Sequence, residues 1–188
     1  MKTTLEEYIV NNFTGKAVCV VGNAVITKKY GKIIDDHDIV MRINHYDLSD
    51  RFVAFTGRKT THYCNEGLNW RSQNHSFTVS LCPFPERCEG TVITDGEPFD
   101  VDNWGGKKIC PSKDWRKLAG IPRLTTGSTI VYILNELEIS TNIFGFDFLK
   151  TGHMWEPEYD MQKHTAHIKE IDKEEALIKS LSNVTICS

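Results

Sequence analysis

The feature that most constrains the fold is a short apolar run that stops at a Gly-Asn pair. Residues 17–21 read AVCVV, and Gly22 and Asn23 follow directly. A strand without apolar/polar alternation is typical of a parallel sheet covered by helices on both faces. We therefore predict a buried central strand here. A tight turn at Gly22 would then bring backbone amides and the Asn23 side chain toward a ligand phosphate or base.

Apolar periodicity along the rest of the chain alternates between helical and extended stretches. The pattern predicts helices at 3–12, near 25–33, at 126–138 and at 172–181, and extended segments at 39–43, 52–55, 60–63, 77–81, 142–146 and 184–187. Residues 83–106 are rich in Pro and Gly and are predicted to be mostly loop. This alternation predicts an α/β fold, a Rossmann-like doubly wound sheet that binds its ligand beyond the carboxyl ends of the strands.

Length and charge narrow the function classes. The chain has 188 residues, 40% of them hydrophobic, and a formal net charge of −3. We expect one domain over residues 1–188, with no basic field for nucleic acid or an anionic membrane. No apolar run approaches the roughly 20 residues of a membrane span, and the first ten residues lack the apolar core of a signal peptide. We expect a cytoplasmic protein whose six cysteines are reduced and structural.

Four sequence motifs follow one another along the chain. In order they are VCVVGNA at 18–24 with IDDHDIVMRIN at 34–44 and GRKTT at 57–61; LTTG at 124–127 with IFGF at 143–146; HMWE at 153–156; and HIKE at 167–170. Together they resemble the large, small, third and very small sialyl motifs of the eukaryotic-type sialyltransferase family. The resemblance leaves out most of residues 65–120. It suggests a short cytoplasmic bacterial or viral member of that family, with its GT-A-like variant of the Rossmann-like sheet.

The resemblance implies an inverting glycosyltransferase that needs no metal or other cofactor. The donor would be CMP-sialic acid, and the acceptor a glycan hydroxyl of the lipooligosaccharide or capsule type. The residues that would hold the CMP moiety are Gly22, Asn23, Asn44, Thr125, Thr126 and Gly127. A helix that starts at Thr126 would offer free amides and hydroxyls at its positive end, which suits a phosphate or carboxylate.

Two histidines receive catalytic roles from the same resemblance. His153 would stabilise the leaving phosphate, and His167 would take the proton of the acceptor hydroxyl, with His164 as the alternative base. A neutral imidazole with a pKa of about 6.5 suits a general base. The other histidines are assigned no role in the chemistry. His37 is expected to be structural, and three further histidines are expected to be ordinary polar or surface residues. These are His45, His62 and His75.

Departures from the family pattern keep other functions open. Ala24 replaces the serine that follows Gly-Asn in the family, which leaves CMP-Kdo as an alternative donor. A protein that binds CMP without catalysing transfer is the alternative from another class. Cys19 lies one position off the family's disulfide position, and Glu138 stands where its partner would be. The expected partners are a CMP-activated sugar acid and an acceptor glycan, not nucleic acid; peripheral membrane contact and a homo-oligomer stay open.

Overall fold

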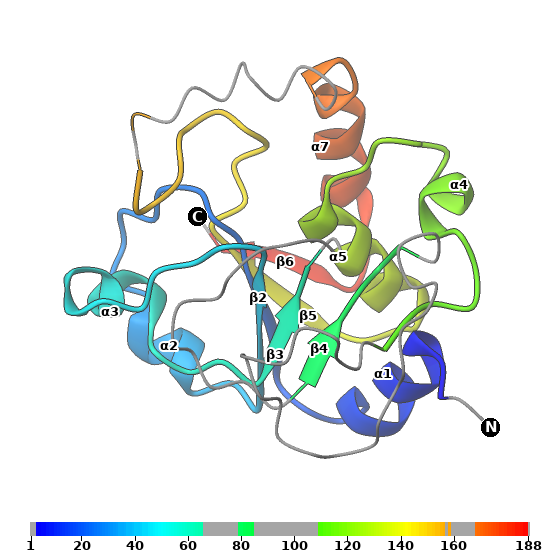
Figure 1. The fold of residues 1–188 in the computed structure, drawn as a ribbon, viewed down its shortest axis with the longest axis horizontal. Helices are drawn as coiled ribbons and strands as arrows, with labels where there is room; N and C mark the ends of the chain where they lie inside the picture. The colour runs from blue at the N-terminus through cyan, green and yellow to red at the C-terminus, as the bar shows by residue number, and fades with distance from the viewer. Residues whose placement is uncertain (1–2, 66–78, 85–108, 157, 159–167, 188) are drawn as a thin grey trace.

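A six-stranded parallel sheet organises the computed structural model, which describes residues 3–65, 79–84, 109–156, 158 and 168–187 (Figure 1). The strands are β1 (Val18–Val21), β2 (Ile39–Ile43), β3 (His62–Cys64), β4 (Val79–Leu81), β5 (Thr141–Phe144) and β6 (Val184–Cys187). The helices are α1 (Leu5–Phe13), α2 (Gly31–Asp35), α3 (Asp50–Thr56), α4 (Trp115–Ala119), α5 (Thr126–Glu136) and α7 (Ile171–Ser180). The predicted α/β class is confirmed.

The order of the strands creates a switch point beside β1. The sheet runs β4-β3-β2-β1-β5-β6, so the chain winds outward in one direction through β4 and returns on the other side of β1 as β5. Val21, at the end of β1, is in register with Arg42 of β2 and with Phe144 of β5. The carboxyl ends of the three strands therefore lie together where the winding reverses, which is where ligands bind in open parallel sheets.

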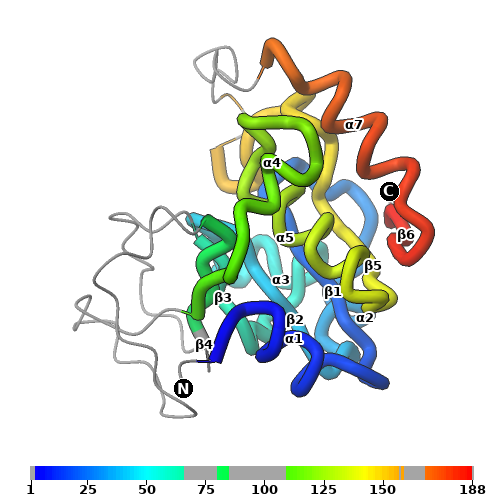
Figure 2. The backbone as a smooth tube through the Cα atoms, turned by 90° about the vertical axis from the view of Figure 1, so that its right-hand side faces the viewer, coloured from blue at the N-terminus to red at the C-terminus, as the bar shows by residue number. Residues whose placement is uncertain are grey.

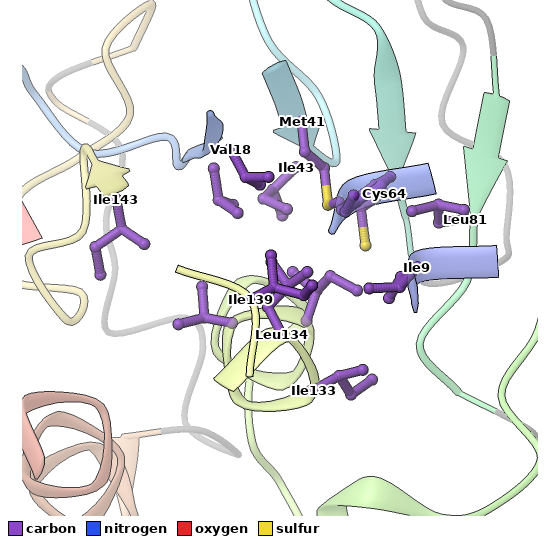
Figure 3. Close-up of a cluster of buried hydrophobic side chains, with 14 of the residues drawn as sticks. Ile9, Val18, Met41, Ile43, Cys64, Leu81, Ile133, Leu134, Ile139 and Ile143 are labelled. Carbon is purple, nitrogen blue, oxygen red and sulfur yellow. The ribbon is translucent and has the colours of Figure 1, made fainter. Parts of the chain in front are cut away.

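Both faces of the sheet are covered, as the unbroken apolar run of β1 predicts. Successive residues of a strand point to opposite faces. One face packs Val18, Met41 and Ile143 against helices α1 and α5 (Figure 3). The other packs Cys19, Val40 and Phe144 against Ile34 of α2 and neighbouring residues. All residues of β1 and β2 are buried, because each strand contributes to both cores.

Helix α5 confirms the clearest helix of the sequence. Ile130, Ile133 and Leu134 are fully buried against the sheet, and Leu137 packs beside them. The helix begins after Thr125, whose hydroxyl accepts a hydrogen bond from the backbone N–H of Ser128 at 3.3 Å. This cap satisfies one of the free amides of the first turn.

Two local predictions are wrong. Residues 52–55 were predicted to be extended, but they belong to helix α3, which packs Phe55 against the cluster that contains Ile34 of α2 rather than pairing with a strand. The helix predicted near 25–33 is displaced to Gly31–Asp35. Helix α4 was not predicted at all. In each case the stretch is too short for its apolar period to separate helix from strand.

Two histidines are structural, one of them unexpectedly. His37 is structural, as predicted, and it is buried: its Nδ1 lies 2.8 Å from the Ile33 carbonyl and its Nε2 is 2.9 Å from the Asn142 amide. His62 was expected to be an ordinary polar residue, but it is only 4% exposed. Its Nε2 lies 3.0 Å from the hydroxyl of Tyr8 and its Nδ1 2.8 Å from that of Thr61.

Stability should fall between neutral and mildly acidic pH because of His62. Burial first, and then the positive charge of Lys16, lower the pKa of His62 from 6.5 to about 4. The unfolded chain therefore binds a proton more readily than the folded protein, so this stabilisation is complete above about pH 6.5 and is lost as the pH falls toward 4. The shift corresponds to about 3 kcal/mol. Urea unfolding at pH 7 and pH 4.5 should show most of that loss.

The matched variant for this prediction is His62→Phe, which keeps an aromatic ring in the same packing site. The variant should be less sensitive than the parent to the same pH change. An equal pH dependence in both proteins would contradict the assignment to His62, because the remaining loss would then come from other groups.

The cysteines only partly follow the prediction. Cys19, Cys64, Cys82 and Cys187 are free thiols, and burial raises the pKa of Cys19 to about 12. Cys110 is disulfide-bonded, so the expectation of six reduced thiols is wrong at this position. Among the described helices, none has the length and apolar character that crossing a bilayer requires.

Candidate active site

A cavity of about 540 Å³ lies at the switch point of the sheet. It is lined by residues that follow β1, β2 and β5, by the first turn of α5, and by the segment around His153. All the predicted CMP-binding residues and one of the two predicted catalytic residues line it: Gly22, Asn23, Asn44, Thr125, Thr126, Gly127 and His153. Residues as far apart in sequence as Gly22 and His153 therefore share one site. His164 and His167 lie outside the described residues.

Two asparagines form one side of the cavity. The Asn23 side chain donates a hydrogen bond to the Ile43 carbonyl at 3.1 Å, which ties the end of β1 to the end of β2. Asn44 adopts a φ of 50°, in the left-handed region that asparagine tolerates better than most residues. Its side-chain oxygen is buried and has no hydrogen-bond partner among the described residues. A ligand N–H or O–H at this point would satisfy that acceptor.

Two glycines of the cavity leave room for the ring of Phe146. A Cβ on Gly22 would lie 2.4 Å from the Gly145 carbonyl oxygen and 3.1 Å from the Phe146 ring, and one on Gly127 would lie 3.0 Å from the same ring. Phe146 follows β5, so it packs between the end of β1 and the start of α5. The glycines predicted for ligand binding are therefore required by packing as well.

The first turn of α5 is held by a buried carboxylate. Glu174 of α7 is 4% exposed, and it accepts hydrogen bonds from the Thr125 N–H at 3.0 Å, the Thr125 hydroxyl at 2.7 Å and the Ser128 hydroxyl at 2.6 Å. In both views α4 and α7 flank the start of α5 (Figures 1 and 2). A carboxylate at the positive end of a helix is stabilising. Glu174 thus fixes the turn that carries Thr126 and Gly127.

The HIKE motif of the sequence contains Glu170, not Glu174. The structure places Glu174, one helical turn later, in the cavity wall, whereas Glu170 does not line it. The spacing of the acidic residues along α7 gives no sign of which carboxylate turns inward.

Glu174→Ala should lower the free energy of unfolding by about 2–3 kcal/mol, because hydrogen bonds to a buried charged group are lost and their donors are left unpaired. Urea unfolding measures the change. Asp172→Ala is the control, since Asp172 lies exposed in the first turn of the same helix. Equal destabilisation by the two substitutions would show that the contacts of Glu174 with α5 contribute little.

Three aromatic side chains that line the cavity contact one another. The rings of His153 and Trp155 are stacked, with centroids 4.8 Å apart and planes 22° apart. His45 meets the same indole edge-on, at 5.0 Å. His45 was expected to be an ordinary polar residue, and its place beside the cavity corrects that expectation. Backbone contacts hold this wall, because the Met154 N–H donates to the Asn23 carbonyl at 2.8 Å and Ala24 pairs with His153.

The cavity offers hydrogen-bond donors at the start of α5, amide groups at Asn23 and Asn44, and imidazoles at His45 and His153. Such a set suits a ligand with an anionic group and a polar base or sugar. No cluster of three or more potential metal ligands occurs among the residues that the structure describes.

Part of the chain matches a known family model. Residues 9–81 match the model of glycosyltransferase family 29 (sialyltransferase). Over these residues the chain is similar to the sialyltransferase family. The matched segment runs from α1 to β4 and includes Gly22, Asn23 and Asn44. This similarity supports a glycosyltransferase enzyme.

Two solved structures share the fold of this chain. A mammalian sialyltransferase in complex with Gal-beta-1-3GalNAc-ortho-nitrophenol superposes with a TM-score of 0.52 at 19% identity, covering 92% of this chain and 69% of the other. A second mammalian sialyltransferase structure gives a TM-score of 0.51 at 20% identity, covering 92% and 68%. Among curated proteins, none matches the sequence significantly.

Proposed function

We propose that this protein is a sialyltransferase that transfers sialic acid from CMP-sialic acid to a hydroxyl of an acceptor glycan, with inversion and without a metal. One observation carries the choice of donor: Asn44 has a buried side-chain oxygen that lacks a partner among the described residues, inside a cavity that also contains the start of α5. The amino group of cytosine or a ribose hydroxyl would satisfy this acceptor. The amides of the first turn would receive the phosphate.

The proposed reaction is a single displacement. The oxygen of the acceptor hydroxyl forms a bond to the anomeric carbon of the sugar acid, and the bond from that carbon to the phosphate oxygen breaks. His167 takes the hydroxyl proton, and CMP leaves with the electron pair of the broken bond. His153 donates a hydrogen bond to the leaving phosphate, whose negative charge develops in the transition state.

The identity of the sugar depends on the contact beside Ala24. A serine at this position would add a hydroxyl next to the cavity, and alanine removes it. Because the residue that replaces it cannot donate a hydrogen bond, CMP-Kdo is the second candidate donor. The acceptor is proposed to be a glycan of the lipooligosaccharide or capsule type, built in the cytoplasm.

Release of CMP tests the proposal. Purified protein is incubated in EDTA with CMP-sialic acid or CMP-Kdo, with and without a panel of galactosides, and CMP and the glycan product are quantified. Release that depends on acceptor and survives EDTA is expected with CMP-sialic acid. Release with CMP-Kdo alone would change the donor. Measurable CMP binding without release from either donor would support a non-catalytic binding protein and contradict the transfer reaction.

A further inference from the structure

One cationic side chain lies among the described residues that line the cavity. Arg116 belongs to the short helix α4, and the carbon of its guanidinium lies 3.5 Å from the centroid of the Phe84 ring. Arginine stacks on aromatic faces through its planar, delocalised charge. This stack orients the guanidinium plane, so the positive charge is held at one place in the wall.

The other charged lining residues are acidic. Asp147, Glu156 and Glu174 carry carboxylates, and the hydrogen bonds of Glu174 go to Thr125 and Ser128. An anionic substrate that enters the cavity therefore meets three carboxylates and one permanent positive charge among the described residues. In a partly buried site, charges interact more strongly than in water. Binding of a second anionic group, beyond a phosphate at the start of α5, thus depends on Arg116.

We propose that Arg116 binds the carboxylate of the sugar acid in the donor. The inference rests on the proposed function, because the donor is then a nucleotide ester of a sugar that carries its own carboxylate. A guanidinium presents N–H groups in a fork that matches the two oxygens of a carboxylate. The start of α5 and Arg116 line the same cavity from different helices, so the two anionic groups of the donor have separate binding groups. Arg116 thereby selects acidic sugars over neutral ones.

Binding measurements separate the two anionic groups. Calorimetry at pH 7 in EDTA compares three ligands: CMP, the unreactive 3-fluoro analogue of CMP-sialic acid, and the methyl ester of that analogue. Arg116→Met is expected to lower the affinity for the analogue about 10- to 100-fold. CMP and the methyl ester should keep their wild-type affinities. The affinity of Arg116→Lys for the analogue should lie between those of the wild type and Arg116→Met, because lysine keeps the positive charge but lacks the forked N–H groups.

Lys117→Met is the matched control, because Lys117 is exposed on the same helix and does not line the cavity. It should bind all three ligands as the wild type does. Thermal unfolding checks that each variant is folded; if Arg116→Met is not, Arg116→Gln replaces it.

Two results would overturn the inference and leave the proposed function intact. In one, Arg116→Met lowers the affinities for CMP and for the analogue equally; in the other, it leaves the affinity for the analogue unchanged. The first would place Arg116 on the nucleotide, and the second would remove it from donor binding. Failure of the wild type to bind both CMP and the analogue would overturn the proposed function, and the inference with it.

Discussion

Replacement of His167 by alanine is expected to slow sialyl transfer about 10²- to 10⁴-fold, the usual contribution of a positioned general base. The acceptor hydroxyl would then have to lose its proton to water as the bond to the anomeric carbon forms. The affinity for CMP should be unchanged, because the base acts on the acceptor and not on the nucleotide. Initial rates at saturating donor, together with CMP binding, measure both quantities.

His164→Ala is the matched control, since His164 lies three residues earlier in the same segment. It should retain activity close to that of the wild type. The reverse outcome, a large loss at His164 with a nearly intact His167→Ala, would assign the base to His164. Full activity in both variants would contradict a histidine base in this segment.

Gly22→Ala is expected to destabilise the fold by about 3 kcal/mol, at the upper end of the usual cost of overpacking. The added Cβ would lie 2.4 Å from the Gly145 carbonyl oxygen, and this oxygen belongs to the backbone and cannot rotate away. The ends of β1 and β5 would have to separate. Because that separation opens the cavity floor, the affinity for CMP should fall together with the free energy of unfolding.

Gly15→Ala supplies the comparison for this prediction. Gly15 has a φ of +75° and open space around its Cβ position, so alanine there costs only the strain of the left-handed conformation, about 1 kcal/mol. CMP affinity should stay at the wild-type level. If Gly22→Ala were no more destabilising than Gly15→Ala, the close approach of β1 and β5 would not be the reason for glycine at position 22.

Local pattern was sufficient to predict strand β1 and helix α5. The unbroken apolar run of β1 predicted a strand buried on two faces, and the spacing of Ile130, Ile133 and Leu134 predicted the buried face of α5. These signals are strong because burial repeats with the period of the element. Short segments such as α3 and α4 carry too few periods, and their conformation is decided by what they pack against.

Side-chain partners could not be predicted in the same way. His62 and Glu174 look like ordinary polar residues in the sequence, yet both are buried, and their partners, Tyr8 and Thr125, are about fifty residues away. Arg116 likewise joins the cavity through a helix that no periodicity marks. Contacts of this kind depend on how helices meet the sheet, and no local spacing records that.

By itself the sequence determined the parallel α/β class and several residues of the cavity: its asparagines, Gly22, Gly127 and His153. Strand burial and short motifs depend on neighbouring residues, so they can be identified from the sequence. Only the tertiary structure decided that the Asn44 side-chain oxygen lacks a partner among the described residues, that Glu174 rather than Glu170 holds the first turn of α5, and that Arg116 lines the cavity. The physical reason is that burial and charge depend on distances through space, which the reversal of winding beside β1 sets.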